Sequence, residues 1–206
     1  MTGGTFEGTF EVNQGTATIE GGSFRGGRSL EVNNNSVVNI TGGDFSTTFT
    51  VEEGSDVSIS GGVFGGTFTV GNRGSVDISG GTFDRIFLQG TAELNLSGGT
   101  VSGLVTSNSG DLNIFGTEFF IDGDLVEFLA LGETLNLRGQ DLTLAGTLLD
   151  GSDFEIQFGS GVSSQSFVNS VNLTLSTAVP EPSSLMLLIT CFGLGTLKRR
   201  RPPATR

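Results

Sequence analysis

The sequence predicts an all-β protein built on a parallel β-helix (β-solenoid), and three observations support this prediction. A Gly-Gly pair recurs along the first 120 residues, apolar and polar residues alternate around each pair, and segments rich in Asn, Gly and Ser separate the alternating runs. Alternation with period two, bounded by Gly and Asn, is typical of strands, and a fixed repeat is typical of stacked coils. We expect about seven coils of ~19 residues over residues 1–120, a short antiparallel β cap over 121–178, and a tail with an apolar helix over 179–206.

The glycines define the coil length. The first glycines of successive repeats lie 18 to 21 residues apart, at Gly3, Gly21, Gly42, Gly61, Gly80, Gly98 and Gly116. The segments around them read MTGGTF, IEGGSF, ITGGDF, ISGGVF, ISGGTF, LSGGTV and IFGTEF. A Gly pair suits a sharp corner, where φ is positive or where the next coil approaches too closely for a Cβ atom. We expect a right-handed winding, because parallel crossovers usually have this hand.

Two apolar columns are expected to face inward. The first is aromatic and consists of Phe6, Phe24, Phe45, Phe64, Phe83, Val101 and Phe119. The second is aliphatic and consists of Ile19, Ile40, Ile59, Ile78, Leu96 and Ile114. Burial of each such side chain is worth about 1.5–3 kcal/mol, which explains how so narrow a domain acquires a core.

The outward positions suggest two faces. A polar ladder contains Thr18, Asn39, Ser58, Asp77, Asn95 and Asn113. We interpret this ladder as a solvated face whose side chains hydrogen-bond along the stack, with a carbohydrate- or ion-binding face as the alternative. A second column aligns the triplets TFE, SLE, TFT, TFT and IFL, the last at residues 86–88. Only two adjacent triplets keep Thr at both ends, so an ice-binding array is a weaker alternative.

The period stops near Phe120, although strand-like alternation continues. Two alternating runs, at 142–149 and 154–158, flank Asp150-Gly151, a pair favoured in tight turns, and they predict a β-hairpin. An antiparallel piece here would cover the last coil and prevent end-to-end pairing of exposed strand edges.

Composition excludes several functions. The chain of 206 residues has no His and one Cys, so imidazole catalysis, an internal disulfide and a thiolate zinc site are excluded. The net charge of −12 argues against a nucleic-acid partner. The calcium-binding nonapeptide of other β-rolls is absent, so we expect no metal, and nothing suggests a cofactor. Arg25, Arg28, Arg73 and Arg85 occupy different coil positions, without paired carboxylates at recurring offsets. We therefore predict a protein that is not an enzyme.

The last residues form a tail of three parts. Pro180, Glu181 and Pro182 precede an apolar run of 13 residues at 185–197, and Lys198, Arg199, Arg200 and Arg201 follow it. As a helix this run would span about 20 Å, short of the ~30 Å hydrocarbon core of a bilayer. Cys191 lies within the run and is most simply a small apolar residue. The basic cluster should stay cytoplasmic, with the body across the membrane.

This order of Pro-Glu-Pro, apolar segment and basic cluster resembles the PEP-CTERM sorting signal of Gram-negative bacteria, a tail also described as the ice-binding-protein C-terminal domain. The resemblance implies export, transient insertion into the inner membrane, and processing near Pro180 by an exosortase-type enzyme. It further implies residence in the cell envelope or in an extracellular matrix, with exopolysaccharide as a partner. The SGGTF-type repeats and the segment at 144–154 also look like bodies found before this tail.

The first residues begin inside a coil. Met1 occupies the position of the aliphatic column, and no signal peptide precedes it. Because export of the body needs such a signal, we expect the natural protein to begin upstream. The leading hypothesis is an exported, non-enzymatic structural or adhesive protein of the cell surface. The alternatives are an ice- or carbohydrate-binding solenoid and, least favoured, a polysaccharide-active enzyme.

Overall fold

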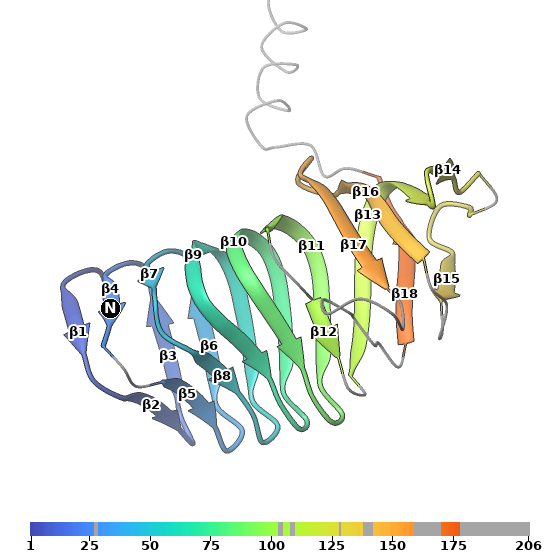
Figure 1. Cartoon of the computed structure of the whole chain (residues 1–206). Helices are drawn as coiled ribbons and strands as arrows, with labels where there is room; N and C mark the ends of the chain where they lie inside the picture. The colour runs from blue at the N-terminus through green and yellow to red at the C-terminus, as the bar shows by residue number, and fades with distance from the viewer. Residues whose placement is uncertain are drawn as a thin grey trace, which may run out of the picture.

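The computed structural model is a stack of parallel coils followed by a C-terminal block in which most strands pair antiparallel (Figure 1). It describes residues 1–26, 29–102, 105–107, 110–127, 129–137, 142–158 and 170–177. All regular structure in these ranges is β, and strands that are successive along the stack pair in parallel. The predicted all-β solenoid is confirmed, with about five turns. The larger count of about seven coils stays a prediction.

Each coil runs through three short strands, which fuse into longer strands in the middle of the stack. The early strands are β1 (Thr5–Glu7), β2 (Phe10–Asn13), β3 (Thr16–Ile19), β4 (Ser23–Arg25), β5 (Leu30–Asn33), β6 (Val37–Ile40), β7 (Asp44–Phe45) and β8 (Phe49–Val51). The later strands are β9 (Asp56–Val70), β10 (Ser75–Leu88), β11 (Glu93–Val101) and β12 (Val105–Ser107). The register places like residues above one another, as in the pairs Phe24 with Phe45 and Ile40 with Ile59.

The two predicted inward columns form the core. Phe24, Phe45, Phe64 and Phe83 stack face to face, with ring centroids 4.6 to 4.7 Å apart. A second aromatic column, which includes Phe49, meets them edge to face, so rings of both columns interlock. Such pairs add about 0.5–1.5 kcal/mol each beyond burial of their area. Every residue of the aliphatic column is buried, whereas two residues of the aromatic column, Phe6 at its start and Val101 near its end, are partly exposed.

The two glycines of a corner have different roles, as Gly80 and Gly81 illustrate. A Cβ atom on Gly80 would lie 2.5 Å from the carbonyl oxygen of Ser60 in the preceding coil, which no side chain tolerates. Gly81 has φ of +104°, in the region that residues with a Cβ atom avoid. Both parts of the predicted explanation are therefore confirmed, one at each glycine.

The C-terminal block contains β13 (Asp111–Ile121), β14 (Asp124–Leu125), β15 (Thr134–Leu137), β16 (Leu142–Leu148), β17 (Asp153–Phe158) and β18 (Ser170–Leu175). The predicted hairpin about Asp150-Gly151 is confirmed, because β16 and β17 pair antiparallel around it. The second half of β13 pairs antiparallel with β16, which joins this hairpin to the last coil.

One strand of this block departs from the expected antiparallel cap. β18 lies parallel to β13, with Leu112 beside Val171 and Ile114 beside Leu173. It therefore adds a further parallel layer to the stack, and β15 covers this layer in the antiparallel sense. The prediction of a wholly antiparallel cap is wrong at β18, because alternating polarity identifies a strand without revealing its direction.

Candidate functional site

The ladder face, formed by β3, β6, β13, β18 and the first halves of β9, β10 and β11, carries a chain of side-chain hydrogen bonds. Asn95 Nδ2 donates to Asp77 Oδ1 at 2.8 Å, and Asn113 Nδ2 donates to Asn95 Oδ1 at 2.7 Å. The chain continues into the cap, where Asn172 donates to Asn113 at 2.7 Å and Asn136 donates to Asn172 at 2.6 Å. Five side chains from five strands are thus connected along the axis of the stack.

This geometry confirms the interpretation of the ladder as a face that hydrogen-bonds along the stack, for Asp77, Asn95 and Asn113. Each amide donates to the layer before it and, except at the end, accepts from the layer after it. The earlier ladder positions, Thr18 and Asn39, are exposed, and their side chains make no hydrogen bond with the described residues. The connected part of the ladder therefore begins in the middle of the stack.

A second outward face, here called the threonine face, consists of β2, β5, β8 and the ends of β9 and β10. The expected alignment of the triplet IFL with the threonine triplets is wrong. Ile86 and Leu88 are fully buried, and the register places Arg85 beside Thr67 and Phe87 beside Thr69. The physical reason is that the connection after Phe83 is one residue shorter than the connection after Phe64. Residues 85–88 therefore face the opposite way from that expected for equal connections.

Two hollows follow the edge of the threonine face. The larger, of about 820 Å³, is lined by Thr9, Gly26, Ser29, Ser46, Thr47, Thr48, Thr50 and Gly66. The smaller, of about 420 Å³, is lined by Gly65, Gly66, Thr67, Asp84, Arg85 and Ser102. Gly66 lines both, so the two hollows adjoin each other, and together they are here called the hydroxyl groove. Its polar lining consists chiefly of Ser and Thr hydroxyls.

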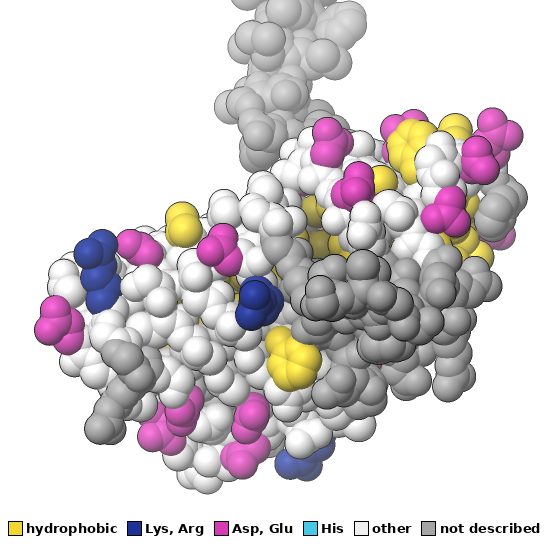
Figure 2. Space-filling view, in the orientation of Figure 1, with side chains coloured by type: hydrophobic (Ala, Val, Ile, Leu, Met, Phe, Trp, Pro, Cys, Tyr) yellow, Lys and Arg dark blue, Asp and Glu magenta, His cyan; other side chains and the backbone are white. Residues whose placement is uncertain are grey.

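Charge is unevenly distributed around this groove. Figure 2 shows acidic side chains spread over coils and cap, with few basic ones among them. Among the described residues, Arg25 forms an ion pair with Asp44 at 3.3 Å and donates to Ser23 at 2.6 Å. Arg85 is exposed and makes no ion pair or hydrogen bond with any described residue. The groove therefore contains a cation that the described part of the protein does not neutralise.

A third hollow, of about 640 Å³, lies between the last coils and the hairpin. Glu118, Asp153, Glu155 and the half-exposed Phe120 are among its lining residues, and Ser102 lines both this hollow and the smaller hollow beside Arg85. Asp153 accepts a hydrogen bond of 3.0 Å from Thr147 on the adjacent strand. Within the described ranges, no group of three or more acidic, Cys or His side chains is arranged to hold a metal ion.

The residues of the predicted sorting signal are not tested by this geometry. Pro180, Glu181, Pro182, Lys198, Arg199, Arg200 and Arg201 all lie outside the described residues, as does the apolar run at 185–197. In the part of the chain that is described, no helix is long and apolar enough to cross a bilayer.

Comparison with known proteins found no matching family model, no similar curated protein and no similar solved structure.

Proposed function

We propose that the chain is a non-enzymatic structural or adhesive module of the cell surface or extracellular matrix, exported and then processed through its C-terminal tail. The observation that supports the structural role best is the hydrogen-bonded ladder, Asp77–Asn95–Asn113–Asn172–Asn136. Its side chains bond mainly to one another, as suits a face that stiffens a rod. A rod of about seven coils would hold its two ends roughly 30 Å apart, at about 4.8 Å per layer.

The core suits the same role. Phe64 is fully buried and stacks on Phe45 and on Phe83, each at 4.6 Å, while Phe49 and Phe68 meet its edges. A narrow rod with interlocked rings along its length resists bending better than one with a sparse aliphatic core, because close-packed interiors have low compressibility. A spacer or adhesive module benefits from this stiffness.

The destination is proposed from the tail. Pro180-Glu181-Pro182, an apolar helix over 185–197 and the basic cluster from Lys198 to Arg201 would place the body outside the inner membrane until an exosortase-type enzyme cuts near Pro180. The mature protein would then stay in the envelope or enter the matrix, with exopolysaccharide as a partner.

The test is intact mass spectrometry of the protein from fractionated native cells. We expect a mature species ending near Pro180 in the envelope or medium, and its loss when the tail is deleted from Pro180 onward. An uncleaved chain of 206 residues in the cytoplasm would contradict the proposal.

Two matched variants distinguish the cleavage of the tail from the orientation of its apolar segment in the membrane. Replacement of Pro180, Glu181 and Pro182 by Ala should leave the chain membrane-inserted and uncut. Replacement of Lys198 and the three following arginines by Gln should instead disturb insertion, because the basic cluster fixes which side stays cytoplasmic.

Ice binding remains the alternative that a specific feature favours, namely the adjacent pairs Thr48–Thr50 and Thr67–Thr69. The register aligns Thr50 with Thr69, but Thr69 is only 9% exposed, so the pairs do not form a fully exposed array. Thermal hysteresis of the purified protein would distinguish this alternative, and we expect none.

A further inference from the structure

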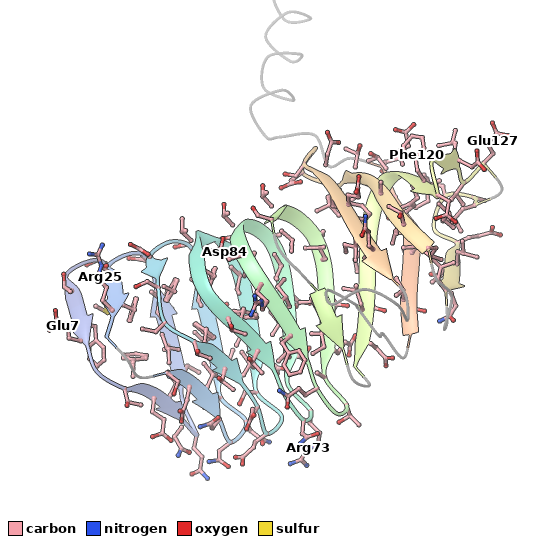
Figure 3. The ribbon with its side chains drawn as sticks, in the orientation of Figure 1. Glu7, Arg25, Arg73, Asp84, Phe120 and Glu127 are labelled. Carbon is pink, nitrogen blue, oxygen red and sulfur yellow. The ribbon has the colours of Figure 1, made fainter. Side chains whose placement is uncertain are left out.

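The guanidinium of Arg85, which has no ion-pair partner among the described residues, is the feature that the proposed function leaves without a role. The described residues contain three arginines, Arg25, Arg73 and Arg85, among many carboxylates. Arg25 is paired with Asp44, and Figure 3 shows Arg73 at the turn between β9 and β10, apart from Asp84. Asp84 precedes Arg85 and lines the same hollow, yet no ion pair joins the two. Because no carboxylate of the described residues pairs with this guanidinium, we expect it to be available to an anion from outside.

The surroundings of Arg85 indicate what kind of anion fits. Thr67 and Ser102 line the same hollow as Arg85, and this hollow adjoins the larger one at Gly66. Hydroxyls accept and donate hydrogen bonds, so they suit a ligand that does both. Gly65 leaves the groove open, because an added Cβ atom there would meet nothing within 4 Å. The groove is therefore long, shallow and polar, as an extended chain ligand requires.

An apolar surface lies beside the cation. Phe87 is the next outward residue on β10 after Arg85, and it is half-exposed, unlike the buried rings of the core. Thr69 and Thr106 are its neighbours in the register. A phenylalanine ring of this kind offers a flat apolar platform for one face of a sugar ring. Figure 2 shows a basic and a hydrophobic side chain close together on the viewed face of the coils.

We infer that the hydroxyl groove binds an extended acidic polysaccharide, a chain of uronate sugars. Arg85 pairs with a uronate carboxylate, Phe87 supports a sugar ring, and the Ser and Thr hydroxyls of the groove bond to the sugar hydroxyls. A planar guanidinium binds a carboxylate through two parallel hydrogen bonds, which adds geometric specificity to charge attraction. This inference rests on the proposed adhesive function and names the chemistry of its partner.

The test is titration of the purified full-length protein with an oligogalacturonate, followed by calorimetry. We expect saturable binding that weakens as salt is added, because exposed charges are screened. Its fully methyl-esterified counterpart keeps the same backbone without the charge, and we expect it to bind at least about tenfold more weakly, since tenfold corresponds to about 1.4 kcal/mol. Absence of binding, or equal binding of the two probes, would overturn the inference.

Three variants examine the assignment of residues. Arg85→Gln should reduce affinity for the oligogalacturonate about tenfold or more, whereas Arg73→Gln, with the same change of charge in a distant turn, should not. Asp84→Asn should raise the affinity, because it removes a carboxylate from the hollow. An unchanged affinity in Arg85→Gln, with circular dichroism like that of the parent protein, would contradict the role of Arg85. These binding results are independent of processing and localisation, so failure of either proposal is recognised separately.

Discussion

In the coils, a strand pairs with a strand about one repeat away in the sequence, whereas in the cap the partner of a strand lies either next along the chain or much farther off. Asn95 and Asn113, in adjacent coils, are 18 residues apart, while Asn113 and its cap partner Asn172 are 59 apart. The coil core is a column of interlocked rings, whereas the described residues of the cap have a single ring contact, Phe119 with Phe154, at 6.3 Å. Repetition therefore gives the coils dense, local packing, and the cap closes their end with sparser, less local contacts.

The largest expected difference concerns this ring packing. Phe64→Ala removes a fully buried ring stacked on both sides, and we expect it to lower the free energy of unfolding by about 3–5 kcal/mol. Phe154→Ala removes a ring with one edge contact and should destabilise less, near the lower end of that range. Urea unfolding followed by circular dichroism measures both. If Phe154→Ala lowered the free energy of unfolding more than Phe64→Ala does, ring packing would stabilise the cap more than the coils, contrary to our expectation.

Two adjacent glycines provide the next test. A Cβ atom on Gly66 would lie 2.1 Å from the carbonyl oxygen of Thr47, so Gly66→Ala must separate two coils. We expect a loss of about 1–3 kcal/mol, typical of overpacking. Gly65→Ala is the matched control in open space, where restriction of the unfolded chain should give a gain of up to about 1 kcal/mol.

The same close approach occurs in the cap. A Cβ atom on Gly146 would lie 2.3 Å from the carbonyl oxygen of Glu118 on the neighbouring strand. If Gly146→Ala is tolerated while Gly66→Ala is not, the cap adjusts its backbone more easily than the coils do, which sharpens the difference between the two regions. Thermal unfolding of the three glycine variants side by side measures this.

The hydrogen-bonded ladder extends from the coils into the cap. We expect its bonds to contribute less to the free energy of unfolding than the buried rings do. Asn113→Ala breaks the hydrogen bonds to Asn95, Asn172 and Glu93 and should cost about 1–2 kcal/mol. Asn39→Ala, at an exposed ladder position whose side chain makes no such bond among the described residues, should cost under about 0.5 kcal/mol. Hydrogen exchange in β18 should rise only in the first variant. Equal effects would mean that the ladder contributes no stability of its own.

The smallest effect is expected at the ion pair of Arg25 with Asp44. Both side chains are well exposed, at 62% and 48%, so Asp44→Asn should cost less than about 1 kcal/mol, and only at low salt. Unfolding at two salt concentrations measures the difference. A loss that persists at high salt would indicate that Asp44 acts through another contact.

The coils could be predicted well from the sequence because each coil repeats the same glycine corner and the same buried positions. Phe24, Phe45 and Phe64 could be placed in one column by counting from the glycines, and their stacking confirms it. The one-residue shift at Arg85 was missed, although a signal existed: two residues separate Phe83 from Ile86, where three separate Phe64 from Phe68. That count alone moves Arg85 and Phe87 to the outside.

The fold of the cap is harder to predict because no local sequence pattern shows whether a strand pairs parallel or antiparallel. Asn172 and Asn136 repeat the ladder pattern, an Asn between two aliphatic residues, as Asn113 does, so their place on the ladder could have been found. The parallel direction of β18 and the antiparallel direction of β15 could not, since both have the same alternation. The choice depends on connections that the cap makes across long stretches of chain.

The parallel pairing of β18 with β13 delays the completion of the stack during synthesis of the chain. Earlier layers can form as soon as one more repeat leaves the ribosome, but the layer opposite Asn113 waits for Asn172, 59 residues later. Closure of this longer loop costs roughly 1 kcal/mol more entropy than closure of a single coil. Until then, the last coil exposes an unpaired edge, which is the kind of template on which nascent chains aggregate. We therefore expect a chaperone that shields strand edges to reduce aggregation most at the stage before β18 is synthesised.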